Sequence, residues 1–156
     1  MNLDLHHPAN AKLLASFSGS QLPPIASPDS VKNPYFEQGS HPDIVERVWD
    51  QLGKGFPPEA QCLLFGSPAL VDPENGIVVA VAYGTAYVVR IPVSAVAEAM
   101  GLRARTTMQW SFGKPTDIQE LFGDDWIFGA WLNQEAAWCR QASQEVSLEQ
   151  PDGADR

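Results

Sequence analysis

The stretch from Gly76 to Pro92, GIVVAVAYGTAYVVRIP, decides the fold of this chain. Its two halves, Ile77 to Tyr83 and Tyr87 to Ile91, are short runs of β-branched and aromatic residues, which are typical of β-strands. Gly84 and Thr85 lie between them and suit a two-residue hairpin turn of type II′, in which glycine takes the first position. The stretch therefore predicts a β-hairpin.

The first strand of this hairpin is apolar along its whole length. Strict alternation of side chains puts them on two faces, with Ile77, Val79, Val81 and Tyr83 on one and Val78, Ala80 and Ala82 on the other. A strand with two apolar faces has to be covered on both sides, so we expect it at the centre of the sheet. The face that carries the alanines is small, and a helix should lie close against it.

The cleanest helical pattern precedes the hairpin. Ser40 is placed to cap a helix, Pro42 fits its first turn, and Gly53 marks its end. The apolar stripe of this helix consists of Ile44, Val45, Val48, Trp49 and Leu52, and the outward face consists of Asp43, Glu46, Arg47, Asp50 and Gln51. We expect this helix to cover one face of the sheet.

The remaining elements alternate between strands and helices. The patterns predict a strand from Gln61 to Phe65, a short edge strand from Pro68 to Val71, a helix from Pro92 to Met100, a strand from Arg103 to Ser111, a short helix from Thr116 to Gly123, and a final helix from Trp126 to Gln144. This order predicts an α+β domain with a mostly antiparallel sheet of four or five strands, packed with helices.

The 156 residues are enough for one domain with a substantial core. Residues 1–39 read as a helix followed by an extended, partly flexible segment, because residues 19–39 concentrate glycine, serine and proline. Residues 40–146 form the predicted globular domain, and residues 147–156 form a flexible tail. No basic leader or long apolar run is present, so we expect a soluble, cytoplasmic protein that does not enter a membrane.

The net charge of −9 constrains the partners of this protein. Nucleic acid is an unfavourable ligand, because a polyanion would be repelled over most of the surface. A basic protein partner fits the charge, and nothing in the sequence indicates the oligomeric state. Cys62 and Cys139 lie in apolar patterns without a neighbouring histidine, so both are expected to be buried, unreactive thiols.

Two residues are candidates for catalysis. Glu135 falls within the apolar stripe of the predicted final helix, where a carboxylate would be desolvated unless it is paired. We favour a structural role over that of a catalytic acid. In that role the carboxylate lies at the rim of the stripe, accepts a hydrogen bond from an indole N–H, or pairs with an arginine. Cys139 would need a histidine as its base, and we favour an inert thiol. No metal-ligand spacing, phosphate-binding loop or cofactor motif is present.

A third candidate is an acidic group beside an aromatic residue, which consists of Asp117, Glu120, Asp124, Asp125 and Trp126. Helix capping accounts for two or three of these carboxylates, and Asp124 and Asp125 are expected to be exposed caps of the final helix. Carboxylates around a tryptophan also have the composition of a protein-binding surface, while Trp126 fits a place in the hydrophobic core equally well. The group is therefore the predicted partner-binding site.

The stretch from His41 to Arg140, with its hairpin followed by FGDDWIFGAWLNQEAAWC, resembles the small acidic bacterial immunity proteins of interbacterial toxin systems. The resemblance lies in size, net charge and the general pattern of residues, and it assigns a role to no individual residue. It implies a cytoplasmic antitoxin that binds a cognate toxin directly, with nucleases as attractive targets because their phosphate-binding surfaces are basic. The alternatives are a small hydrolase or transferase that uses Glu135 or Cys139, and a scaffold or chaperone domain.

Overall fold

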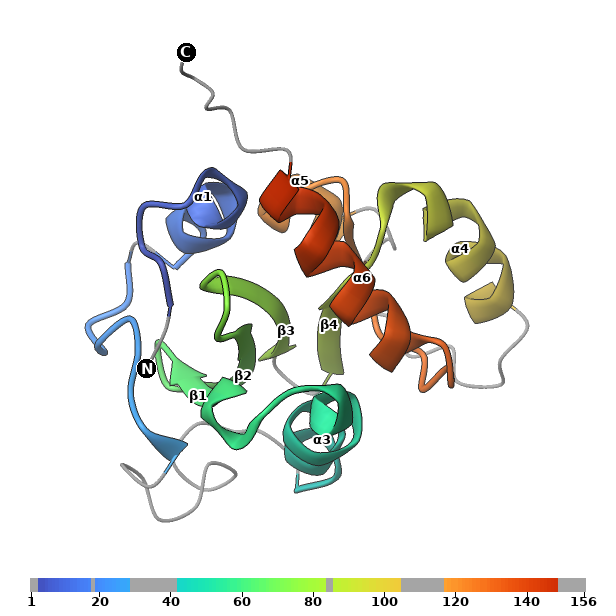
Figure 1. Ribbon diagram of the computed structural model, residues 1–156. Helices are drawn as coiled ribbons and strands as arrows, with labels where there is room; N and C mark the ends of the chain where they lie inside the picture. The colour runs from blue at the N-terminus through green and yellow to red at the C-terminus, as the bar shows by residue number, and fades with distance from the viewer. Residues whose placement is uncertain (1–2, 18, 29–41, 84–85, 105–116, 149–156) are drawn as a thin grey trace.

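The computed structural model describes residues 3–17, 19–28, 42–83, 86–104 and 117–148. Within these ranges five strands form one antiparallel sheet in the order β1-β2-β3-β4-β5, which confirms the predicted α+β fold (Figure 1). The strands are β1 (Gln61–Leu64), β2 (Ser67–Asp72), β3 (Ile77–Tyr83), β4 (Ala86–Arg90) and β5 (Trp126–Phe128). The α-helices are α1 (Pro8–Ala15), α3 (Pro42–Glu46), α4 (Val96–Ala104), α5 (Asp117–Phe122) and α6 (Glu135–Leu148).

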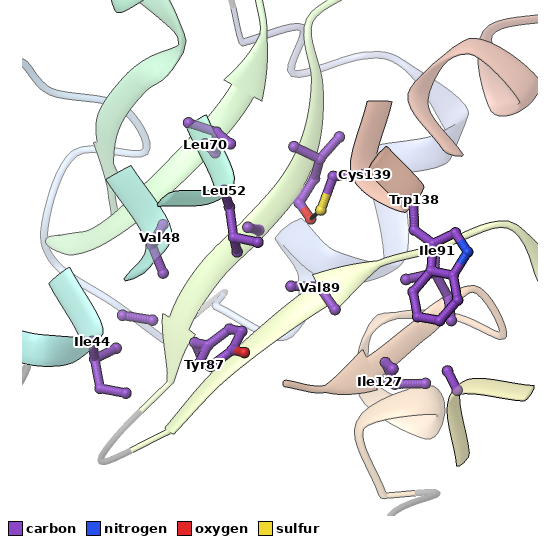
Figure 2. Close-up of a cluster of buried hydrophobic side chains, with 14 of the residues drawn as sticks. Ile44, Val48, Leu52, Leu70, Tyr87, Val89, Ile91, Ile127, Trp138 and Cys139 are labelled. Carbon is purple, nitrogen blue, oxygen red and sulfur yellow. Dashed lines mark hydrogen bonds between the residues drawn. The ribbon is translucent and has the colours of Figure 1, made fainter. Parts of the chain in front are cut away.

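Two hydrophobic clusters cover the two faces of the sheet. One cluster joins the strands to α3, to α6 and to the turns that follow α3, namely η2 (Arg47–Gln51) and η3 (Leu52–Gly55). Figure 2 shows side chains of this cluster, which come from these helical segments, from β2, β4 and β5, and from α6. The second cluster joins the opposite face to α1 and α5. The sheet therefore lies between two helical layers, as its apolar strands require.

The central hairpin is present as predicted, with β3 paired to β4 and to β2. The predicted alternation of side chains in β3 is wrong, however, because the strand contains a bulge. Leu70 pairs with Ala80 and Val71 pairs with Val78, so Val79 has no partner in β2. Val79 consequently joins Ala80 and Ala82 in the cluster beneath α6, while Val78 and Val81 face α1 and α5.

The expectation that a helix lies against the small face of β3 is confirmed, since α6 packs across β3 and β4. Its Cys139 is fully buried, with Sγ 3.5 Å from the carbonyl oxygen of Val79 in the bulge. The turn between β3 and β4, at Gly84 and Thr85, lies outside the described residues.

The predicted helix before β1 is a composite structure. It begins at Pro42 as α3, continues through η2 as a π-helix, and ends in the 3₁₀ turn η3 at Gly55. Its apolar side chains Ile44, Val48 and Leu52 are buried, as predicted. The prediction that Arg47 lies on the outward face is wrong, because its side chain is only 11% exposed and pairs with Glu135. The proposed cap Ser40 lies outside the described residues.

Three other predicted elements need correction. The segment from Pro68 to Val71 is not an edge strand, since β2 lies between β1 and β3. The helix after Pro92 starts with the 3₁₀ turn η5 (Val93–Ala95) and runs beyond Met100 to Ala104 as α4. The predicted strand from Arg103 to Ser111 therefore begins inside a helix, and its part after Ala104 lies outside the described residues.

The predicted final helix is also wrong in its first half. Trp126–Phe128 pairs with β4 as the fifth strand, and α6 begins only at Glu135. Asp124 and Asp125 lie in the turn before β5 and do not cap a helix. The reason is that Trp126, Ile127 and Phe128 have the aromatic and β-branched side chains that favour a strand, although their spacing to Trp131 imitates a helical stripe.

The described N-terminal residues pack against the sheet. Leu13 of α1 is fully buried in the second cluster. The fully buried side chain of Asn10 donates to the carbonyl oxygen of Gly76 at 2.8 Å and accepts from the N–H of Val78 at 3.1 Å. A further bridge joins Ala26 to the edge strand β1. Residues 3–17 and 19–28 thus cover one face and one edge of the sheet.

Candidate functional site

The carboxylate of Glu135 lies in the core at the first residue of α6, with no exposed surface. Its Oε1 accepts hydrogen bonds from Arg47 Nη2 at 2.9 Å and from the Tyr87 hydroxyl at 2.5 Å, and its Oε2 accepts from the N–H of Ala130 at 2.9 Å. Of the structural roles considered for Glu135, pairing with an arginine is therefore the one observed. The group is completely buried, so a place at the rim is wrong.

The two side chains that bind the Glu135 carboxylate, Tyr87 and Arg47, make further contacts of their own. Burial, followed by the negative charge of Glu135, raises the pKa of Tyr87, so the hydroxyl stays protonated and donates. The Tyr87 oxygen also accepts from the N–H of Trp131 at 2.7 Å. The Arg47 guanidinium lies 5.3 Å from the centre of the Trp131 ring and donates to the carbonyl of Leu132 at 2.7 Å. This cluster ties four parts of the chain together and presents no acid to a substrate.

Sequence reasoning missed Arg47 and Tyr87 as partners of Glu135. They lie 88 and 48 residues away from it in the chain, so no local spacing could have linked them. One signal was present at Gly129, where a β-carbon would lie 1.9 Å from the Tyr87 ring. A glycine after a strand can mark such a close approach, but the sequence does not say which ring approaches it.

The two cysteines are buried and free of disulfides, as predicted. Burial raises the pKa of Cys62 to about 12, and burial followed by the charge of Glu135 raises the pKa of Cys139. A thiol that stays protonated and buried is a poor nucleophile. Catalysis by Cys139 therefore has no support in the geometry.

The structure places some residues of the predicted partner-binding group at the surface and others in the interior. Glu120 and Asp124 are exposed, and among the described residues neither carboxylate has an ion-pair partner. Asp125 instead pairs with Arg90 at 2.8 Å and is only 13% exposed. Asp117 begins α5, and its side chain is not among those described.

Trp126 is fully buried, so the expectation that it forms the centre of an exposed surface is wrong. Its ring lies edge-to-face against Phe122 at 5.3 Å and under the Arg90 guanidinium at 4.9 Å. Among the described residues its Nε1 has no hydrogen-bond acceptor. Trp126 is therefore a core residue, which was the other interpretation of its position.

Arg90 is a second buried centre that the sequence did not reveal. Its side chain is 2% exposed, and Nε donates at 2.8 Å to the carbonyl of Val78, next to the bulge. Nη1 donates to Asp125 at 2.8 Å, and Nη2 donates at 3.0 Å to the carbonyl of Ala9 in α1. Arg90 thus fixes α1 and the turn after α5 to the central strands, and the exposed Asp124 lies at the corner that this turn forms.

A hollow of about 410 Å³ lies at this corner. Its lining includes apolar side chains of Val93, Phe122 and Val146 together with the charged groups of Lys12 and Asp124. A second hollow of about 240 Å³ shares Val93 and Val146 with it. Among the described residues, the lining of the larger hollow includes His7 but no cysteine or serine, so it does not pair a histidine base with a nucleophile.

The described ranges contain no group of three or more histidine, cysteine, aspartate or glutamate side chains able to hold a metal ion. In the same ranges, every helix is too short or too polar to cross a membrane. Comparison with models of protein families, with curated proteins and with solved structures finds no match to this chain.

Proposed function

We propose that this protein is a non-enzymatic binding protein that recognises a basic protein partner through the corner formed by α5 and the turn before β5. The proposed biological role is that of a cytoplasmic immunity protein, which neutralises a bacterial toxin by direct binding, with a nuclease as the favoured target. The observation that carries the proposal is the pair of exposed carboxylates, Glu120 and Asp124, on a corner fixed from beneath by Arg90 and Asp125.

The geometry favours recognition by charge. A net charge of −9 steers a cationic partner toward the protein and raises its association rate. A turn whose backbone is fixed by a buried ion pair loses little conformational freedom on binding, so this corner is a favourable contact site. The enzyme alternative is weaker because both residues proposed for it, Glu135 and Cys139, are fully buried and bonded inside the core.

The proposal is tested by capture from a lysate of the source organism, with each recovered protein identified by mass spectrometry. The variant Glu120→Lys/Asp124→Lys reverses the proposed site. The variant Asp50→Lys/Glu59→Lys makes the same change in net charge at exposed positions in η2 and η4 (Pro58–Ala60). We expect a basic protein that binds the wild type and the control variant but not the corner variant. Equal capture by all three proteins would exclude the corner as the site.

A further inference from the structure

The smaller of the two hollows, of about 240 Å³, lies between residues 91–94 and α6 and has mostly apolar walls. Its apolar lining consists of Ile91, Pro92, Val93, Ala142 and Val146. Val93 is 63% exposed, which is more than any other large hydrophobic side chain among the described residues. Together with the half-buried Val146, it offers apolar surface that a partner can bury.

The charged side chains at this hollow are all acidic. Asp125 and Glu145 line it together with Ser94, and among the described residues no lysine, arginine or histidine does so. Arg90 neutralises Asp125 across 2.8 Å. Glu145 accepts from the neutral side chain of Gln141 at 2.9 Å and has no ion-pair partner in the described part of the chain. The Glu145 charge is therefore available to a cation from outside.

The larger hollow adjoins the smaller one but differs from it in charge. The two hollows share Val93, Asp125 and Val146 as lining residues. Lys12 lines the larger hollow as well as Asp124, so an incoming cation is repelled there as well as attracted. The smaller hollow is thus the place beside the corner where a cationic group meets only carboxylates.

Hydrogen bonds within the protein hold the walls of the smaller hollow in place. The N–H of Ile91 donates to the carbonyl oxygen of Asp125 at 2.7 Å, and the N–H of Ala95 donates to that of Pro92 at 2.8 Å. The opposite wall belongs to α6, where Ala142 is only 1% exposed. A hollow that is formed before binding costs little conformational entropy when it is filled.

We propose that the smaller hollow binds one lysine or arginine side chain of the basic partner. Both side chains combine an apolar stem with a cationic head group. The stem packs on Val93 and Val146, and the head group donates to the carboxylate of Glu145. This inference rests on the proposed function and adds a specific contact beside the corner that carries Asp124.

The test uses a defined probe in place of the unidentified partner, namely a short, capped peptide with a single arginine between glycines. Titration into isotopically labelled protein should produce saturable changes in the amide chemical shifts of Val93, Ser94 and Val146. A norleucine peptide keeps an apolar stem without the charge, and a shortened lysine analogue keeps the charge without most of the stem. Both should bind about threefold more weakly or worse. Equal binding of the norleucine peptide, or changes confined to other parts of the protein, would overturn the inference.

Variants test the two parts of the contact separately. Glu145→Gln removes the charge but keeps an acceptor for Gln141, and it should weaken binding of the arginine peptide about threefold. Glu98→Gln removes an exposed carboxylate that lines neither hollow and should bind like the wild type. Val93→Ser removes apolar surface and should also weaken binding, whereas Leu22→Ser, at a position that is 43% exposed elsewhere, should not. Equal binding by Glu145→Gln and Glu98→Gln would contradict the proposal.

The captured basic protein separates this inference from the proposed function. A loss of affinity with both Glu120→Lys/Asp124→Lys and Val93→Ser/Glu145→Gln supports the two together. If only the corner variant loses affinity, the inference fails and the proposed function stands. If the arginine peptide binds in the smaller hollow but no basic protein is captured, the proposed function fails and the preference of the hollow for a cationic side chain stands.

Discussion

Tyr87 donates a hydrogen bond of 2.5 Å from its hydroxyl to Oε1 of Glu135 in the interior of the protein. The same oxygen accepts from Arg47, so one carboxylate joins β4, η2 and α6. The residues are far apart in the chain, and the contact can form only when the helical layer is seated on the sheet. The cluster around Glu135 therefore holds the helical layer that contains η2 and α6 against the sheet.

Glu135→Ala should lower the free energy of unfolding by about 3 kcal/mol, because it leaves the Arg47 charge and the Tyr87 hydroxyl without their acceptor. Chemical denaturation followed by circular dichroism gives this value. Glu98→Ala in α4 removes an exposed carboxylate and should change the stability by less than about 0.5 kcal/mol. A loss at Glu135 no larger than the loss at Glu98 would show that the cluster is unimportant for stability.

Gly129→Ala should destabilise the protein by about 1–3 kcal/mol, because the added methyl group would lie 1.9 Å from the Tyr87 ring and force it to move. Gly101 lies inside α4, and a β-carbon there meets nothing within 4 Å. Gly101→Ala should therefore stabilise the helix by about 0.5–1 kcal/mol. Thermal unfolding of the two variants should shift in opposite directions, and a shift in the same direction would refute the close approach at Gly129.

The two thiols should be unreactive in the folded protein. Burial raises the pKa of Cys62 to about 12, and Cys139 has no exposed surface. A colorimetric disulfide reagent at mildly alkaline pH should label neither cysteine under native conditions and both after denaturation. Rapid labelling of either thiol in the folded state would contradict the observed burial.

Stability should decrease as the pH falls below the ordinary pKa of histidine, 6.5, because burial lowers the pKa of His7 in the folded protein. The unfolded chain then binds the proton more readily, and protonation removes the Nδ1 acceptor that caps α1 at the N–H of Ala9. His7→Asn keeps a capping acceptor without titrating and should reduce this loss. His6→Asn, at an exposed position, is the control, and an identical pH profile for wild type and His7→Asn would disprove the assignment.

The sequence was sufficient for those parts of the fold that depend on local patterns. The apolar residues from Ile77 to Tyr83 predicted a central strand, and the spacing of Ile44, Val48 and Leu52 predicted the helix that covers it. It was insufficient where a tertiary contact decides the outcome. At the β3 bulge, the carbonyl oxygen of Val78 accepts a hydrogen bond from Arg90 in β4, and that of Val79 accepts one from Cys139 in α6. No pattern within β3 therefore predicts the bulge.

The candidate site shows the same division. The carboxylates Glu120 and Asp124 were correctly expected at the surface, since charged residues in a short helix and a turn are solvated. Sequence patterns could not place Asp125 and Trp126 in the interior, because their burial depends on Arg90, which pairs with Asp125 and covers the Trp126 ring. Reversing the charge of Asp125 would break its buried pair with Arg90, so the surface variant changes Glu120 and Asp124 instead.

The most direct test of the central claim is the affinity of the captured basic protein for purified wild type, for Glu120→Lys/Asp124→Lys and for Asp50→Lys/Glu59→Lys, measured at low and at high salt. Both variants change the net charge equally, so a difference between them reports the site itself. We predict that the corner variant binds about tenfold more weakly at low salt, with a smaller salt dependence, while the control variant stays close to the wild type. Equal weakening of both variants, or no weakening of either, would contradict recognition at this corner.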